Sequence, residues 1–174
     1  DIIARSVKVN AGLWAKDLKI TTGRNKVDAA HEKIEKGSDD DTTRPQLAVD
    51  VSSLGGMYAG KIRMVGTERG VGVRNAGAIG AQAGSVTLTA DGRIENSGTL
   101  RASDSAALRT AGEVSNTGVL TAANNVQVNA ASLTSSKESV LAAGVNTDGK
   151  LADAGDLQLT TSGQLSAHGQ TLAG

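Results

Sequence analysis

A repeat of about 20 residues constrains this chain more than any other feature. Residues 92–111 read GRIENSGTLRASDSAALRTA and residues 112–131 read GEVSNTGVLTAANNVQVNAA, so that glycine, asparagine and apolar positions coincide at a shift of 20. Related segments occur at 75–79 and 139–143, and the pattern resumes after 155. A unit this short cannot bury its apolar face alone. The repeat therefore predicts a solenoid, in which successive copies stack and share one core.

Within each unit the apolar residues alternate with polar ones, as in Val86/Leu88 and Val126/Val128. Alternation with a period of two is typical of short, half-buried β-strands. Stacked strand–turn units of this length predict an all-β, right-handed parallel β-helix with about 20 residues per coil. Equivalent apolar residues then form inward rows, which we expect to be Ile94–Val114–Leu133 and Leu100–Leu120–Leu141.

The segments between the strands have the form Asn-x-Gly, which is turn chemistry because both residues tolerate a positive φ. Stacking would align the asparagines and the glycines of successive turns. We expect the asparagines to form a buried ladder of amide hydrogen bonds, which makes them structural residues rather than ligands. The predicted ladder and turn residues are Asn75, Asn96, Asn116, Gly77, Gly98 and Gly118.

Composition and charge exclude several classes of protein. The 174 residues include 22 glycines, one tryptophan, one tyrosine, no phenylalanine and no cysteine, which excludes an aromatic-cored enzyme domain and a disulfide scaffold. Eighteen basic residues balance 18 acidic ones, so the charge favours neither nucleic acid nor an anionic membrane. No apolar run is long enough to span a membrane as a helix. Because the chain opens at Asp1, we interpret it as a fragment of a longer protein.

Two segments interrupt the pattern. Residues 28–46 are densely charged and include the one proline, so we expect a solvated excursion, with any helix short and confined to 28–37. Residues 145–155 form a turn-rich insertion. We divide the chain into a less regular part, 1–74, and a repeat part, 75–174, which continue one another as one β-helix.

The segments VKVNAGLWAKDLKITTG at 7–23 and VDVSSLGGMYAGKIRMVGTERGVGVRNAG from Val49 resemble the two-partner-secretion exoproteins of Gram-negative bacteria. These are filamentous-haemagglutinin-like adhesins and contact-dependent growth inhibition proteins. The residues that carry the resemblance most clearly are Leu54, Gly55, Gly56, Met57, Tyr58, Gly66, Thr67, Glu68, Gly70 and Gly72.

The resemblance implies a right-handed parallel β-helix, with 1–74 as the carboxy-terminal part of the secretion domain and 75–174 as haemagglutinin-type repeats. It also implies export through the periplasm by an outer-membrane transporter, and a place at the bacterial surface or in the medium. The family's Asn-Pro-Asn-Gly and Asn-Pro-Asn-Leu signatures do not occur, since Gln46 follows Pro45. The part that the transporter recognises is therefore expected outside this chain.

The motifs that could indicate a catalytic or ligand-binding site are each incomplete. The glycines before Lys61 have the spacing of a phosphate-binding loop, but Ile62 stands where Ser or Thr would hold magnesium. His31 has no second histidine nearby, since His168 is far along the chain, and the Asp39–Asp41 run lacks convergent calcium ligands. We expect no cofactor, no metal and no catalysis.

The two aromatic side chains, Trp14 and Tyr58, are expected to plug or cap a coil, with a sugar platform as the alternative.

The sequence predicts a structural shaft segment of a secreted adhesin or growth-inhibition protein. The alternative is a module that binds a receptor or carbohydrate on a host or neighbouring cell. A carbohydrate-cleaving β-helix ranks last, because the acidic residues scatter over different repeat positions. Strand-like sequence at both ends predicts that the fragment associates end to end.

Overall fold

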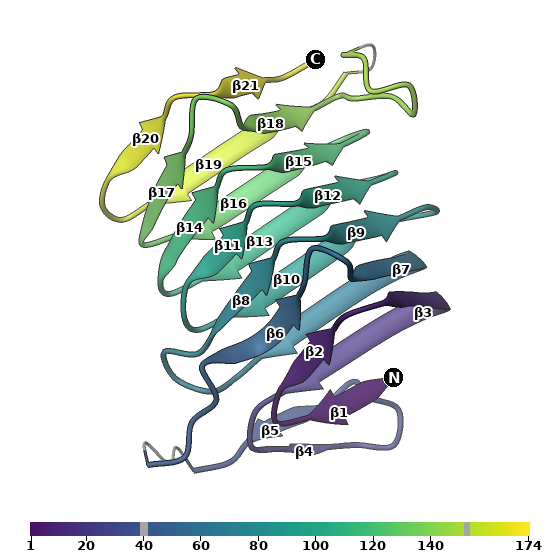
Figure 1. Ribbon diagram of the computed structural model, residues 1–174, viewed down its shortest axis with the longest axis vertical. Coiled ribbons are helices and arrows are strands. Elements are labelled where there is room, and N and C mark those ends of the chain that lie inside the picture. Colours follow the sequence, from purple (N-terminus) through teal and green to yellow (C-terminus); the bar gives the residue numbers. More distant parts are fainter. Residues whose placement is uncertain (39–41, 152–153) are drawn as a thin grey trace.

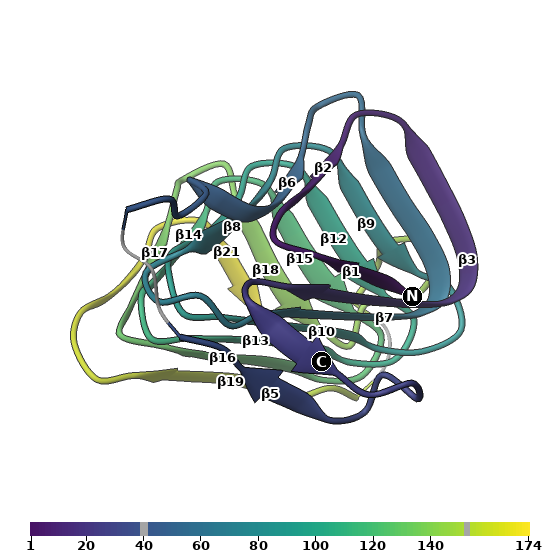
Figure 2. The same cartoon turned by 90° about the horizontal axis from the view of Figure 1, so that it is seen from below.

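The chain folds into a right-handed parallel β-helix whose coils rise from the N-terminus to the C-terminus (Figure 1). A computed structural model describes residues 1–38, 42–151 and 154–174. Each regular coil contributes one short strand to each of three faces, and Figure 2, a view along the stack, shows the coils lying over one another. The described part of the chain contains no helix, and so no helix that could cross a membrane.

The first face is a seven-stranded parallel sheet. Its strands, in spatial order, are β2 (Val7–Val9), β6 (Leu47–Val51), β8 (Gly72–Asn75), β11 (Ile94–Asn96), β14 (Glu113–Asn116), β17 (Ser132–Ser135) and β20 (Leu165–Ala167).

The second and third faces belong to one twelve-stranded parallel sheet that bends along its long strands, β3 (Gly12–Thr22) and β7 (Gly56–Gly66). The second face continues from β7 through β9 (Ala78–Ala81), β12 (Thr99–Ala102), β15 (Val119–Ala122), β18 (Val140–Ala143) and β21 (Gln170–Leu172). The third face continues through β10 (Val86–Ala90), β13 (Ala106–Thr110), β16 (Val126–Ala130) and β19 (Leu157–Thr161), while β1 (Ile2–Ala4) pairs with the end of β3.

The core is a set of apolar rows that run the length of the helix. Strand pairing places Ile94 beside Val114 and Val114 beside Leu133, and it places Leu100, Leu120 and Leu141 in a second row. All six side chains are almost fully buried. These inward rows and the all-β class are confirmed. Burial alternates along the strands, as in β10, because inward and outward side chains alternate in a strand.

The charged segment 28–46 differs from the prediction. It contains β5 (Ile34–Lys36), which pairs antiparallel with β4 (Asn25–Val27), where the sequence allowed at most a short helix. His31, in the turn of this hairpin, is buried rather than solvated. Nearby polar groups explain the burial, because the His31 ring bonds to Thr21 of β3 and so anchors the turn on the third face.

The carboxy-terminal strands β19, β20 and β21 end the sheet orders, so each pairs on one side only within the described residues. Leu165 and Leu172, on two of these strands, are exposed. We expect the 174-residue chain to self-associate through these edges, giving elongated species in sedimentation velocity as concentration rises.

Leu172→Lys should suppress the association, because a charge on an edge strand opposes pairing with another chain. Leu54→Lys is the matched control, since Leu54 is exposed in a turn. A single monomer boundary for the parent chain over a hundredfold concentration range would contradict this prediction.

Candidate functional site

Three asparagines lie one above the other at the end of the first-face strands. Asn75 Nδ2 donates to Asn96 Oδ1 at 2.8 Å, and Asn96 Nδ2 donates to Asn116 Oδ1 at 2.8 Å. Each amide also donates to a backbone carbonyl of the next coil, at Thr99, Val119 and Val140 in turn. All three side chains are nearly inaccessible to solvent. The amides therefore satisfy one another and offer nothing to a ligand.

The ladder has definite ends. Val51 precedes Asn75 in the pairing register and Ser135 follows Asn116. The buried Ser135 Oγ has no hydrogen-bond partner within the described residues. The amide row therefore covers the coils from β8 to β14 and stops where serine replaces asparagine.

The turn glycines are needed for a reason other than the predicted one. Gly77, Gly98 and Gly118 do not have positive φ angles. A Cβ atom added at Gly98 would lie 2.0 Å from the carbonyl oxygen of Gly77, and one at Gly118 would lie 2.1 Å from that of Gly98. Successive turns stack so closely that only a residue without a side chain fits.

The residues that carry the family resemblance divide between two ends of one long strand. Leu54 is exposed and Gly55 lies in the turn before β7, whereas Met57 is fully buried inside the helix. Gly66 ends β7, and Gly70 follows with a φ of +71° and donates its N–H to Asp91 Oδ1 at 2.6 Å. The two groups therefore do not form one site.

A polar cluster surrounds the second group. Glu68 is buried, and Arg5 donates to its carboxylate at 2.5 Å and 3.4 Å. Thr67 Oγ1 donates to Asn25 Oδ1 at 2.6 Å, which ties the turn to the start of the hairpin. In Gly72 a Cβ would lie 2.1 Å from the Arg93 carbonyl oxygen, so the next coil again excludes a side chain. This cluster joins four separate segments and is structural in kind.

The expectation was that the aromatic side chains plug or cap a coil, and the exposure of Trp14 rules out the plug. Trp14 is 74% exposed on the second face. It stacks on Tyr58 of the next strand, with ring centroids 5.7 Å apart and planes inclined by 22°. Each ring leans back over a glycine two residues earlier, Gly12 or Gly56, where a Cβ would clash with it. The two rings therefore lie on the outer side of the strands and not in the interior of the helix.

The other sequence motifs do not form a binding site in the described part of the chain. Lys61 lies within strand β7, and in the described part of the chain no helix follows that could present its N-terminus to a phosphate. No cluster of three potential metal ligands occurs among residues 1–38, 42–151 and 154–174. Asp39–Asp41 lie outside the described residues.

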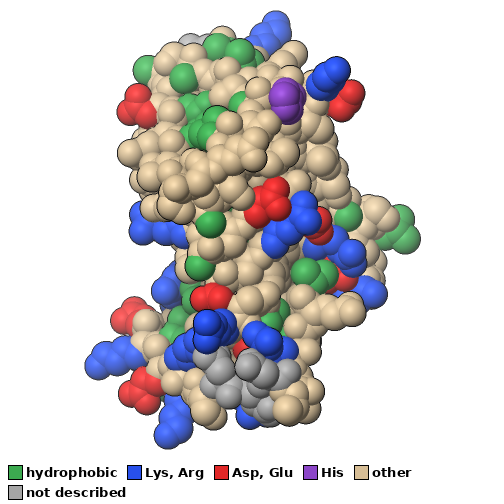
Figure 3. All heavy atoms as spheres, turned by 90° about the vertical axis from the view of Figure 1, so that its left-hand side faces the viewer, with side chains coloured by type: hydrophobic (Ala, Val, Ile, Leu, Met, Phe, Trp, Pro, Cys, Tyr) green, Lys and Arg blue, Asp and Glu red, His purple; other side chains and the backbone are tan. Residues whose placement is uncertain are grey.

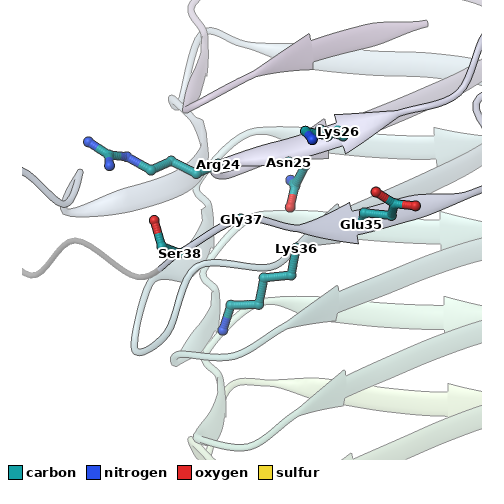
Figure 4. Close-up of a pocket in the computed structure, with 7 residues that line it drawn as sticks. All are labelled: Arg24, Asn25, Lys26, Glu35, Lys36, Gly37 and Ser38. Atoms are coloured by element: carbon teal, nitrogen blue, oxygen red, sulfur yellow. The ribbon is translucent and has the colours of Figure 1, made fainter.

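A cavity of about 410 Å³ lies against the hairpin of β4 and β5. Figure 4 shows that the charged ends of Arg24, Glu35 and Lys36 point in different directions. The charged groups do not converge on a common point, so this cavity has no constellation for catalysis.

Ion pairs on the outside follow the coil stacking. Arg74 donates twice to Asp50 at 2.9 Å, and these bonds hold the pKa of the Asp50 carboxyl below its usual value. Arg93 lies 3.5 Å from both Glu95 and Glu113. Figure 3 shows acidic and basic side chains side by side across this surface, with basic ones gathered toward the lower end. Exposed pairs like these favour the register without forming an active site.

The sequence argued against a metal site or a histidine-based triad at His31, and it gave no signal for the structural contacts of this residue. Its backbone has a φ of +56°, and its Nε2 lies 2.5 Å from Thr21 Oγ1. Its Nδ1 is 3.3 Å from an Asp1 carboxylate oxygen. Burial, followed by the nearby cations Lys19, the amino terminus and Arg63, lowers the pKa of this imidazole. The hairpin is therefore held by a histidine that favours its neutral form.

Comparison with known proteins gives two family matches. Residues 1–96 match the TPS secretion domain, and residues 81–174 match the haemagglutinin repeat. The chain is 60% identical to "Toxin CdiA" of Yersinia pestis over 63% of its length, which is 3% of that protein. It is 42% identical to "tRNA nuclease CdiA-2" of Burkholderia pseudomallei over 99% of its length, or 6% of that protein. No solved structure matches.

We predict that Asn116→Ala lowers the free energy of unfolding by about 1–3 kcal/mol, because Asn96 loses an acceptor for its buried amide. Urea unfolding monitored by circular dichroism measures the change. The control is Asn129→Ala, since Asn129 is exposed on β16 and should tolerate the change. Equal midpoints for the two variants would show that the ladder adds no stability.

We also predict that stability falls as the pH drops from 7.5 to 5.5. The lowered pKa of His31 means that the unfolded chain takes up the proton more readily, so protonation favours unfolding below the ordinary value of 6.5. His31→Asn should flatten this dependence, since asparagine tolerates the positive φ. His168→Asn, which changes an exposed histidine, should leave it intact. A parallel pH dependence in all three proteins would refute the assignment.

Proposed function

Because this chain belongs to the two-partner-secretion exoproteins that carry a TPS secretion domain and haemagglutinin repeats, we propose that it joins the secretion domain to the shaft. In this role it is a rigid β-helical segment of a large exoprotein related to CdiA. It has no catalysis of its own. The chain spans only 3–6% of the relatives described above, so their toxin and nuclease names refer to much longer proteins.

The observation that carries the proposal is the unbroken pairing where the two family matches overlap, at residues 81–96. β10 pairs with β7 before it and β13 after it, and β11 pairs with β8 and β14 in the same way. The core row passes through Val73, Ile94 and Val114 without a gap. One hydrophobic core therefore connects the two regions, which favours a stiff junction over a flexible linker.

The family also supports partners and a location for the parent protein. Membership implies export through the outer membrane by a dedicated transporter, and display at the surface of a Gram-negative cell. Because a β-helix adds one coil at a time, a shaft of this kind extends the parent protein away from the cell.

A spacer tolerates changes of length that preserve its register, and this property provides the test. Deleting residues 97–116 from the parent exoprotein removes one coil and joins Asn96 to Thr117, which keeps the strand register. We expect export and surface display at close to the wild-type level. Deleting 97–106 removes half a coil, sends each strand to the wrong face and should abolish the folded protein.

Protease protection and surface labelling on intact cells measure both deletions. The 174-residue chain carrying each deletion is examined in parallel by circular dichroism. A one-coil deletion that folds normally but blocks display would show that residues 97–116 have a specific role and would contradict the proposal of a passive shaft.

A further inference from the structure

An insertion breaks the coil spacing after β18. On the second face the step from Leu120 to Leu141 is 21 residues, whereas the step from Leu141 to Thr171 is 30. Residues 144–151 and 154–156, the described part of the segment between β18 and β19, lie outside the named strands and form a loop. Insertions in repeat proteins gather on one face, which is often the face that binds ligands.

Hydrogen bonds within the loop hold its first part in a defined conformation. The side-chain oxygen of Asn146 accepts hydrogen bonds from the backbone N–H groups of Asp148 and Lys150, at 3.0 and 2.9 Å. The Asn146 backbone N–H donates to the Lys150 carbonyl at 2.9 Å, and Gly149 turns the chain with a φ of +78°. The loop is thus fixed by its own bonds and provides a preformed wall.

Between this wall and the outer side of β12 and β15 lies a groove of about 450 Å³. The size is within the range of small-molecule sites. Small apolar residues, mostly alanines, alternate with polar side chains along it. The polar side chains that line the groove are Gln82, Arg101, Ser103, Thr121, Asn146 and Thr147.

Thr121 and Arg101 are the two polar groups of this lining on which the argument rests. Thr121 is 95% buried, yet its hydroxyl makes no hydrogen bond to the described part of the chain. Arg101 has no ion pair or side-chain hydrogen bond there either. Its guanidinium lies against the loop, because a Cβ at Gly149 would come within 3.6 Å of Arg101 Nη2. A hydroxyl and a guanidinium that line the same groove therefore have unused hydrogen-bond donors.

We propose that this groove binds a carboxylate-bearing sugar, with its carboxylate on Arg101 and a ring hydroxyl on Thr121. Arginine binds carboxylates through two parallel N–H bonds, which orients a planar acid group better than a lysine would. Hydroxyl and amide side chains match the hydroxyl groups of a sugar, and the alanines match its C–H surface. The acid is a uronic acid or a sialic acid.

Titration calorimetry on the 174-residue chain tests the proposal with three probes. These are methyl β-D-glucuronide, the methyl glycoside of N-acetylneuraminic acid, and methyl β-D-glucoside as the control that lacks a carboxylate. We expect at least one acid to bind, and the neutral glucoside to bind at least about tenfold more weakly. Preference for the glucuronide indicates a uronic acid, and preference for the neuraminide indicates a sialic acid.

Three variants locate the site. Arg101→Gln should weaken binding of the acid by about tenfold or more, and Thr121→Val should weaken it severalfold. Arg109→Gln is the matched control, since Arg109 is an exposed arginine on the third face that bonds to Gln127. Thermal melting confirms that each variant is folded. The proposal fails if neither acid binds, if the glucoside binds equally well, or if folded Arg101→Gln keeps the full affinity.

Discussion

In-register parallel pairing between successive coils is the constraint on which the whole structure depends. Each strand of a coil satisfies its backbone groups with the coil below and the coil above, so each coil can form only on a neighbour of matching shape. A slip of one residue would turn every apolar side chain outward. The rows through Ile94, Val114 and Leu133, and through Leu100, Leu120 and Leu141, bury their apolar side chains because this register holds.

Polar interactions reinforce the same register. The amide ladder of Asn75, Asn96 and Asn116 works only when the turns lie directly above one another. The same closeness excludes side chains at Gly98 and Gly118. The ladder and the glycines thus both depend on the short distance between stacked turns.

The segments that depart from the repeat form the structural features that the regular coils lack. The hairpin of β4 and β5 adds a buried histidine at the amino-terminal end of the stack. The loop after β18 adds a wall beside Arg101. A regular shaft and a local ligand groove are compatible, because an insertion leaves the core rows intact. The same architecture can therefore serve as a spacer along its length and bind at one interruption.

The repeat, its alternation and the Asn-x-Gly turns were enough to determine the β-helix, its core rows and the alignment of the three asparagines. These features follow from local periodicity, because copies of one short unit bury their apolar faces by stacking in register. Only the tertiary structure decided which side of β3 holds Trp14, and that the charged segment 28–46 contains a strand with a buried His31. Only the tertiary structure showed that Leu54 and Gly70 lie at opposite ends of β7, and that the loop after β18 lies against Arg101. Each of these depends on contacts between segments far apart in the chain, and a sequence period carries no information about them.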